Sequence, residues 1–208
     1  MEQKFKTEQE EFWSTEFGNN YILRNADQSL VTSNLSLFSE VFSNCSGIKS
    51  VFEIGPNIGL NLIAINSLLY SAELSAVEIN STAFAELKKL SFIKEAFNNS
   101  ILDFEHSKTY DFVFTKGVLI HINPNELESV YDKIYRMSNK YILVAEYYSP
   151  TPVSVTYRGF ENRLFKRDFA GDLLEKYTNL ELVKYGFRYR RDNHFKQDDF
   201  NWFLLRKM

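Results

Sequence analysis

Several features that would assign a chain to a broad class of protein are missing from this 208-residue sequence. The only cysteine, Cys45, has no second thiol in the chain for a disulfide, so an oxidising compartment is not implied. No segment holds the roughly 18 consecutive apolar residues that a membrane helix needs. The charged N-terminus lacks the apolar stretch of a secretory signal. We therefore expect a cytoplasmic protein without a membrane partner.

An excess of positive charge is also missing, because 24 basic and 27 acidic side chains leave a net charge of −3. Proteins whose main partner is nucleic acid present a basic surface to the phosphates, so we expect no nucleic-acid partner. Hydrophobic residues make up 44% of the chain, which indicates a folded globular protein. The length suits one domain.

Hydrophobic patterning predicts an α/β protein. Residues 1–47 are polar and indicate helices, and short apolar strands then alternate with helices. The strands are expected at 51–54, 74–79, 96–98, 111–114 and 141–145, and the helices at 59–70, 80–90, 123–137 and 167–177. Apolar strands of this kind predict a parallel sheet covered on both faces. Two further strands, at 180–188 and 200–206, have no long helix between them and predict an antiparallel hairpin. We expect a helical extension that acts as a lid at residues 1–47 and one α/β unit at residues 48–208.

The sharpest motif follows the first strand. Gly55 and Gly59 lack side chains, so the backbone there can turn tightly and a ligand can approach it, while Asn57 tolerates a positive φ. These glycines are four residues apart and no third glycine follows, unlike the G-x-G-x-x-G loop of dinucleotide-binding proteins. Glu53 would repel a pyrophosphate, whereas it suits the ammonium and sulfonium charges of S-adenosylmethionine. An ordinary strand-to-helix turn is the alternative.

A second acidic residue, Glu78, ends the next predicted strand. At the carboxyl end of a parallel strand it can accept hydrogen bonds from both hydroxyls of a ribose. Dinucleotide sites use the same contact, so Glu78 indicates adenosine without choosing the cofactor. The alternative is a solvated charge at a strand end.

The sequence from Glu53 to Gly59 resembles the E-x-G-x-G-x-G motif of class I S-adenosylmethionine-dependent methyltransferases, with Asn57 in place of the middle glycine. The resemblance implies a Rossmann-like fold with a mostly parallel seven-stranded sheet and a terminal antiparallel hairpin. It also implies S-adenosylmethionine as cofactor, S-adenosylhomocysteine as product, and no metal. It assigns the adenine contacts to Ser100, at a position that is usually acidic, and Ile101, with Asp103 as the alternative contact. It assigns the methionine contacts to Thr115, Gly117 and Val118.

Further blocks resemble the pseudaminic acid biosynthesis-associated methylases, over nearly the whole chain. They are the opening W…FG..Y..RN at 13–25, central blocks at 146–153, 157–159 and 164–171, and the ending at 198–205. This resemblance implies a role in nonulosonate pathways such as those of flagellin glycosylation. The acceptor would be a pseudaminic- or legionaminic-type sugar, free or CMP-activated. We expect N-methylation of an amino or amidino substituent. O-methylation of a related glycan sugar and a non-catalytic cofactor-binding partner are the alternatives.

The candidate catalytic residues are His121, Glu146 and Tyr147. His121 or Glu146 would remove a proton from the acceptor, and Tyr147 would orient it. His121 can equally pack a helix start. In the N-terminal segment, Trp13 and Tyr21 offer flat faces to the adenosine or the acceptor. Arg24 is a candidate carboxylate ligand, and all three are assigned to cofactor binding. The segment can equally be a helix that packs on the edge of the domain.

A basic segment follows the fifth strand, with Arg158, Arg163, Lys166 and Arg167 within ten residues. We expect Arg158 and Arg163 to bind the carboxylate or phosphate of an anionic sugar, with Tyr148 and Tyr157 stacked on it. The alternative is a solvated helix start capped by Asp168. A sugar dehydrogenase or epimerase is disfavoured because the chain has no Tyr-x-x-x-Lys pair after the fourth strand. A nucleic-acid methyltransferase is disfavoured because no N-P-P-Y-like tetrapeptide stands there.

Overall fold

The computed structural model describes residues 5–24, 27 and 29–208. Seven strands form one sheet in the order β3-β2-β1-β4-β5-β9-β8. The strands from β1 to β5 are parallel, and β9 is antiparallel to both of its neighbours. This is the mostly parallel sheet with a terminal hairpin that the sequence predicts. The strands are β1 (Ser50–Ile54), β2 (Glu73–Glu78), β3 (Ile93–Asn98), β4 (Tyr110–Lys116), β5 (Ser138–Glu146), β8 (Leu180–Arg188) and β9 (Phe200–Lys207).

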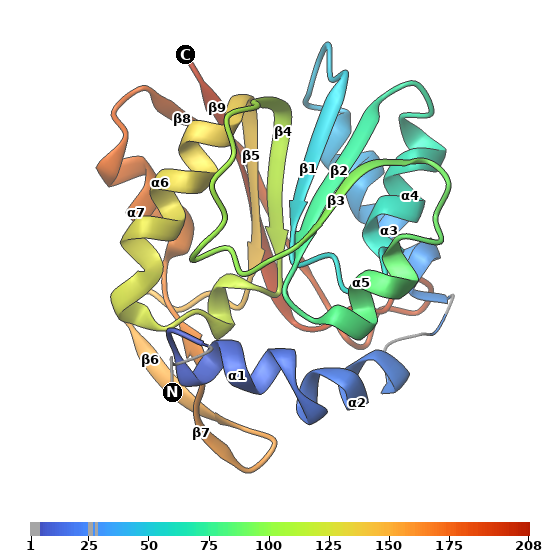
Figure 1. The fold of residues 1–208 in the computed structure, drawn as a ribbon. Coiled ribbons are helices and arrows are strands. Elements are labelled where there is room, and N and C mark those ends of the chain that lie inside the picture. Colours follow the sequence, from blue (N-terminus) through green and yellow to red (C-terminus); the bar gives the residue numbers. More distant parts are fainter. Residues whose placement is uncertain (1–4, 25–26, 28) are drawn as a thin grey trace.

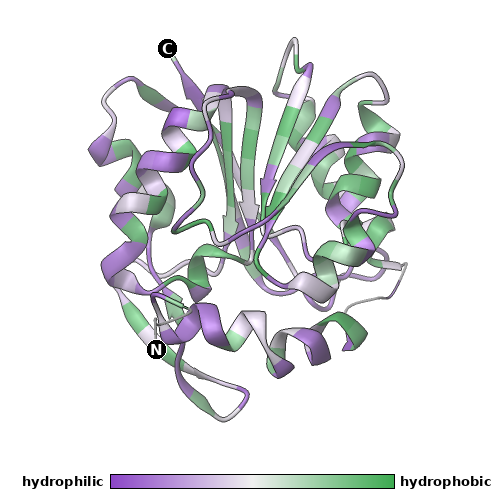
Figure 2. Ribbon diagram, in the orientation of Figure 1, coloured by the Kyte–Doolittle hydropathy of each residue, from purple (hydrophilic) through white to green (hydrophobic). Residues whose placement is uncertain are grey.

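Helices cover both faces of the sheet (Figure 1). They are α1 (Glu8–Ser14), α2 (Glu16–Arg24), α3 (Ser29–Phe42), α4 (Leu60–Leu68), α5 (Ser81–Leu87), α6 (Leu127–Met137) and α7 (Phe169–Lys176), with short 3₁₀ turns η1 (Leu119–His121) and η2 (Pro124–Glu126). One apolar cluster packs α6 and α7 on the sheet through residues such as Ile134 and Leu173, and a second packs α3 and α4 on the other face through Phe38 and Ile65. Figure 2 shows hydrophobic residues along the strands between these layers. No helix among the described residues is long and apolar enough to cross a membrane.

Two N-terminal helices lie apart from these layers. Figure 1 shows α1 and α2 lying across the end of the sheet, beside the β6–β7 hairpin. By contrast, α3 belongs to the core, because Leu37, Phe38 and Val41 are fully buried. Of the expected extension at residues 1–47, the part that stands over the sheet end is therefore α1 and α2.

The helix expected at 167–177 is present as α7, with Asp168 as its N-cap. The segment between β5 and this helix is an element that the sequence does not predict. It forms a separate hairpin of β6 (Val153–Tyr157) and β7 (Phe160–Lys166), and the next helix begins only after Asp168, whose side chain accepts a hydrogen bond from the Gly171 backbone N–H at 2.8 Å. Arg158 and Gly159 make the turn with φ values of 51° and 87°. Val153, Val155 and Thr156 are β-branched, which favours strands over a helix.

Candidate active site

A cavity of about 580 Å³ lies where the parallel strands end. Its walls include Ile54, Glu78, Lys116 and Glu146, the final residues of β1, β2, β4 and β5. The carboxyl ends of parallel strands are where open α/β sheets bind ligands, and this volume suits a small molecule. The predicted residues that line the cavity are Trp13, Tyr21, Gly55, Asn57, Glu78, Ser100, Ile101, Gly117, Val118, His121, Glu146, Tyr147, Tyr157 and Arg158.

The glycine loop has the geometry that its sequence predicts. Gly55 and Asn57 have φ values of 69° and 52°, in the left-handed region that glycine and asparagine tolerate. A Cβ atom on Gly55 would lie 2.7 Å from Cγ2 of Val118, so the loop passes directly beside the segment after β4. Gly59 also has a positive φ, of 87°, but it faces Leu87 and Leu90 instead of the cavity.

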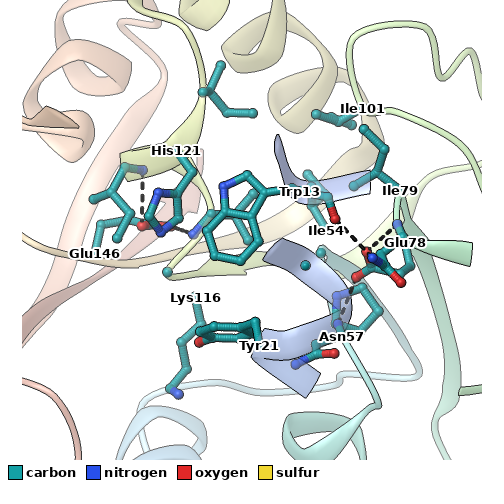
Figure 3. Close-up of a pocket in the computed structure, with 18 of the residues that line it drawn as sticks. Trp13, Tyr21, Ile54, Asn57, Glu78, Ile79, Ile101, Lys116, His121 and Glu146 are labelled. Atoms are coloured by element: carbon teal, nitrogen blue, oxygen red, sulfur yellow. Dashed lines mark hydrogen bonds between the residues drawn. The ribbon is translucent and has the colours of Figure 1, made fainter. Parts of the chain in front are cut away.

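Glu78 ties the loops after β1 and β2 together. Its carboxylate accepts hydrogen bonds from the backbone N–H groups of Asn57 at 2.8 Å and Asn80 at 2.7 Å (Figure 3). Burial raises the pKa of Glu78, and the backbone N–H groups of Asn80, Asn57 and Ile79 oppose that rise. The carboxylate is thus held in place at the cavity wall, where it can accept further hydrogen bonds from a ligand.

Glu53 lies beneath the cavity and does not line it. It is fully buried, and its Oε1 accepts a hydrogen bond from Nδ2 of Asn61 at 2.6 Å. Burial raises the pKa of Glu53 to about 8, and the hydrogen bond from Asn61 and the positive charge of Lys116 oppose the rise. Asn61 does line the cavity. Of this pair only Asn61 faces the cavity, so Glu53 is not placed for the direct ligand contact that its sequence position predicts.

Ser100 connects the loop after β3 to α1. Its hydroxyl donates a hydrogen bond to the Glu10 carboxylate, which also accepts hydrogen bonds from the backbone N–H groups of Lys6 at 2.7 Å and Thr7 at 3.0 Å. Ile101 is buried beside it. Glu10 lines the cavity and was not predicted from the sequence. The family resemblance predicts an acidic residue at position 100. This chain has Ser100 there, and the serine contacts an acidic residue of α1, Glu10.

His121 is held as one tautomer. Its Nδ1 lies 2.6 Å from the carbonyl oxygen of Arg163, which can only accept, so Nδ1 carries the proton and Nε2 keeps its lone pair. Burial lowers the pKa of His121 to about 4, which leaves the ring neutral near pH 7. The ring of Trp13 packs on it, with a centroid 4.5 Å away (Figure 3). The ring of Tyr157 also packs on it, with a centroid 5.0 Å away.

Glu146 anchors the turn that carries His121. Its carboxylate accepts hydrogen bonds from the backbone N–H groups of Val118 and Leu119, both at 3.1 Å, and of Ile120 at 3.4 Å. Burial raises the pKa of Glu146 to about 7 against these donors. Burial and Asp198, to which Tyr147 is hydrogen-bonded, raise the pKa of the Tyr147 phenol. Glu146 is therefore as well placed to position the loop as to take a proton.

The predicted basic cluster is dispersed. Arg163 forms an ion pair with Glu8 at 2.9 Å, Arg167 pairs with Asp172 at 3.1 Å, and the Lys166 ammonium lies over the Tyr147 ring. Successive side chains of a strand point to opposite faces, which separates cations that a helix start would have exposed together. Only Arg158 of this group lines the cavity.

Three further predicted residues lie outside the cavity lining. The Arg24 guanidinium stacks on Phe17 at 5.1 Å, Tyr148 packs against Phe203, and Thr115 is buried within β4. Polar residues that were not predicted line the cavity instead. They are Thr7, Gln9, Glu10, Asn34, Asn61, Asn80, Asn99, Lys116, Asn123, Arg190, Lys196, Gln197 and Asp198. Lys116 had a detectable signal, since it is a charged residue that ends an apolar strand at the ligand-binding edge. Among the described residues, no group of acids, histidines and cysteines is placed to hold a metal.

Comparison with known proteins identifies the fold. No protein-family model and no curated protein matches the chain. The plantazolicin methyltransferase BpumL, solved with S-adenosylhomocysteine, is 16% identical over 96% of this chain and 93% of its own, with a TM-score of 0.67. Magnesium protoporphyrin IX methyltransferase from Synechocystis PCC 6803, also solved with S-adenosylhomocysteine, is 12% identical over 96% of this chain and 97% of its own, with a TM-score of 0.68. The 1,6-didemethyltoxoflavin-N1-methyltransferase of Burkholderia thailandensis is 12% identical over 96% of this chain and 87% of its own, with a TM-score of 0.70. The chain has the Rossmann-like fold of class I S-adenosylmethionine-dependent methyltransferases.

Proposed function

We propose that the chain is a methyltransferase that binds S-adenosylmethionine in this cavity. One observation carries the proposal: the fixed Glu78 carboxylate and the left-handed turn at Gly55 and Asn57 face the same cavity. A carboxylate at the end of β2 suits the two hydroxyls of a ribose, and the open backbone at Gly55 suits a ligand that passes close to it. Ser100 and Ile101 would contact the adenine, and Gly117 and Val118 the methionine portion.

The other residues assigned to the cofactor that do not line the cavity would act indirectly. Glu53 would act through Asn61, and Gly59 and Thr115 would hold the loops in shape. We propose that α1 and α2 form a lid, with Trp13 and Tyr21 facing the ligand and Arg24 on the outer side. Trp13 and Tyr21 line the cavity, which supports this role.

The bound cofactor would supply an electrophilic methyl group, and the chain would align the acceptor and manage one proton. His121 is neutral and its Nε2 carries a lone pair, so it can accept a proton from the acceptor. Glu146 would hold the turn of His121, and Tyr147 would orient the acceptor. The packing of Trp13 and Tyr157 on His121 excludes water from that proton transfer.

For the acceptor we propose a nonulosonic acid of the pseudaminic or legionaminic type, methylated on nitrogen of an amino or amidino group, with O-methylation as the alternative. The blocks at both ends of the sequence that resemble the pseudaminic acid-associated methylases support this class. The cations Arg158, Arg190 and Lys196 at the cavity wall suit an anionic sugar. Tyr157 lies beside Arg158 and can stack on the sugar, whereas Arg163 and Tyr148 would act only indirectly. The fold itself selects no acceptor, because the three similar enzymes are named for three different ones.

The test begins with calorimetric titration of S-adenosylhomocysteine and, separately, NAD. Binding of the former alone is the expected result, and its absence in folded protein would contradict the proposal. The protein is then incubated with labelled S-adenosylmethionine and a panel of free and CMP-activated nonulosonates, and products are read by mass spectrometry. Cofactor binding with no methylated product from any panel member would favour the non-catalytic alternative.

A further inference from the structure

One acidic residue at the cavity wall has no part in the proposed function. Asp198 lies in the loop between β8 and β9, and it is exposed and lines the cavity. It forms no ion pair with any residue in the part of the chain that the structure describes. The next residue differs, because Asp199 does not line the cavity and pairs with Arg190 at 3.3 Å. Asp198 is therefore available to a ligand, whereas Asp199 belongs to the loop.

The loop holds Asp198 in place from both sides. On one side Gln197 is 6% exposed, and its Nε2 donates a hydrogen bond to Oδ1 of Asn34 on α3 at 2.7 Å. On the other side the Asp199 carboxylate accepts a hydrogen bond from the Arg190 backbone N–H at 2.9 Å. A side chain that is held before its ligand arrives loses less conformational entropy on binding.

Aromatic rings lie beside the Asp198 carboxylate. The Tyr147 phenol is hydrogen-bonded to it. Burial raises the pKa of the Tyr21 phenol, and the nearby Tyr157 and Asp198 raise it further. Trp13 continues this wall, because its ring centroid lies 5.1 Å from that of Tyr21 and 6.3 Å from that of Tyr157. All four aromatic residues line the cavity, so a ligand group that reaches Asp198 also meets ring faces.

A carboxylate beside aromatic rings is complementary to a nitrogen cation. The carboxylate supplies the opposite charge and accepts hydrogen bonds from the N–H groups, while the ring faces attract the positive charge. We propose that Asp198 binds the protonated amino or amidino group of the acceptor, against the rings of Tyr147 and Tyr157. This inference rests on the proposed function and deepens it. The acceptor is then a zwitterion whose anionic group binds Arg158, and an N-acylated sugar acid is disfavoured.

The bound nitrogen still needs a base before it can be methylated. A carboxylate beside a protonated nitrogen favours the charged form, so Asp198 binds the acceptor without making it a nucleophile. The Nε2 lone pair of His121 can take the proton, as in the proposed function. The Tyr157 ring packs on His121 with a centroid distance of 5.0 Å, so the same ring borders the base and the proposed cation subsite.

The position of Asp198 favours the acceptor over the cofactor as its ligand. Asp198, Tyr147 and Tyr157 come from the β8–β9 loop, the end of β5 and the β6–β7 hairpin. None of the residues assigned to the cofactor comes from these segments. Figure 3 shows Glu146, the residue before Tyr147, on the opposite side of the cavity from Glu78, which is proposed for the ribose.

The test compares two probes that differ at one nitrogen. They are the methyl glycosides of neuraminic acid, whose amino group is charged at pH 7, and of N-acetylneuraminic acid, whose amide is neutral. Calorimetry with saturating S-adenosylhomocysteine measures both probes on wild type, Asp198→Asn and Asp198→Ser. Glu161→Gln is the matched control, because Glu161 is an exposed acidic residue of β7 that does not line the cavity.

Wild type and Glu161→Gln should bind the amine about fivefold more tightly than the amide, the modest value of a partly exposed charge pair. Both Asp198 variants should lose this preference, while their affinity for the amide stays within about twofold of wild type. The bulk of the acetyl group affects all four proteins alike, so a loss of preference in the Asp198 variants reports the charge.

The inference is overturned if wild type binds both probes equally or binds neither, or if the Asp198 variants keep the wild-type preference for the amine. It is also overturned if these variants bind S-adenosylhomocysteine more weakly, because Asp198 then belongs to the cofactor site. Failure of wild type to bind S-adenosylhomocysteine at all would instead contradict the proposed function.

Discussion

Glu53 and Glu146 are both buried acids, and their surroundings explain why they differ. Glu146 receives three backbone N–H groups, and its pKa rises only to about 7. Glu53 receives one side-chain amide, and its pKa rises to about 8. Each hydrogen bond to a carboxylate favours the charged form against the cost of burial. In both acids burial is the larger effect, and the donors oppose it.

The raised pKa of Glu53 predicts how stability depends on pH. An acid whose pKa is higher in the folded protein than in the unfolded chain stabilises the fold below the unfolded value, and this contribution is lost as pH rises through the folded value. For Glu53 the window runs from 4.5 to about 8. The free energy of unfolding should fall across it by up to about 1.4 kcal/mol per pH unit. Urea unfolding at several pH values should show a flatter profile for Glu53→Gln, and an unchanged slope would contradict the raised pKa.

Glu78→Ala should weaken S-adenosylhomocysteine binding. The loss of a charge-assisted contact to the ribose is expected to cost about 1.5–3 kcal/mol. The variant also removes the acceptor of the Asn57 and Asn80 backbone N–H groups, so urea unfolding must first establish that it folds. Calorimetry on the folded variant then decides, and wild-type affinity would remove Glu78 from the ribose role.

At the scale of elements, the loop from β1 to α4 is fixed by contact with the loop after β4. Gly55→Val should abolish S-adenosylhomocysteine binding, because the new side chain meets Val118 and resists a φ of 69°. Gly159→Val is the matched control, since Gly159 has a φ of 87° but nothing lies within 4 Å of an added Cβ. It should be strained yet bind normally. Normal binding by Gly55→Val would mean that no ligand approaches this loop.

The sequence predicts those elements whose residues pack on the sheet. The five parallel strands and the β8–β9 hairpin were found because buried strands are continuous apolar runs bounded by breakers. The β6–β7 hairpin was missed because only Leu164 among its strand residues is buried, so its pattern lacks apolar periodicity. Its position beside α1 depends on contacts such as the ion pair between Arg163 and Glu8, which join distant parts of the sequence.

Some residues of the candidate site are close together in the sequence, and others meet only in the folded protein. Gly55, Asn57 and Glu78 lie within one strand-helix-strand unit, so local sequence places them together. Lys116, Gln197 and Asn34 meet only because the sheet order brings α3, β4 and the β8–β9 loop to one cavity. No local pattern encodes that meeting.

For the whole molecule, the contacts between α1 and the rest of the chain decide how the cavity is closed. Gln9 donates to the Asn162 carbonyl at 2.9 Å, Glu10 accepts from Ser100, and Glu8 pairs with Arg163. Asn80 also donates to the Trp13 carbonyl at 3.0 Å. These contacts attach α1 to the β6–β7 hairpin and to the loops after β2 and β3.

Arg163→Met and Arg158→Met test this closure as a matched pair from one hairpin. Arg163 pairs with Glu8 of α1, whereas Arg158 lines the cavity and forms no ion pair with α1 among the described residues. Arg163→Met should therefore speed hydrogen exchange of the α1 amides by about two- to fivefold, the modest value of a partly exposed ion pair. It leaves the Arg163 carbonyl in place for His121. Arg158→Met should leave exchange in α1 unchanged and weaken binding of an anionic acceptor instead.

Saturating S-adenosylhomocysteine should slow exchange in α1 in wild type and in both variants, because Trp13 then contacts a ligand. Equal exchange in both variants would show that the ion pair does not hold α1, and the proposal of a lid fastened by this hairpin would fail.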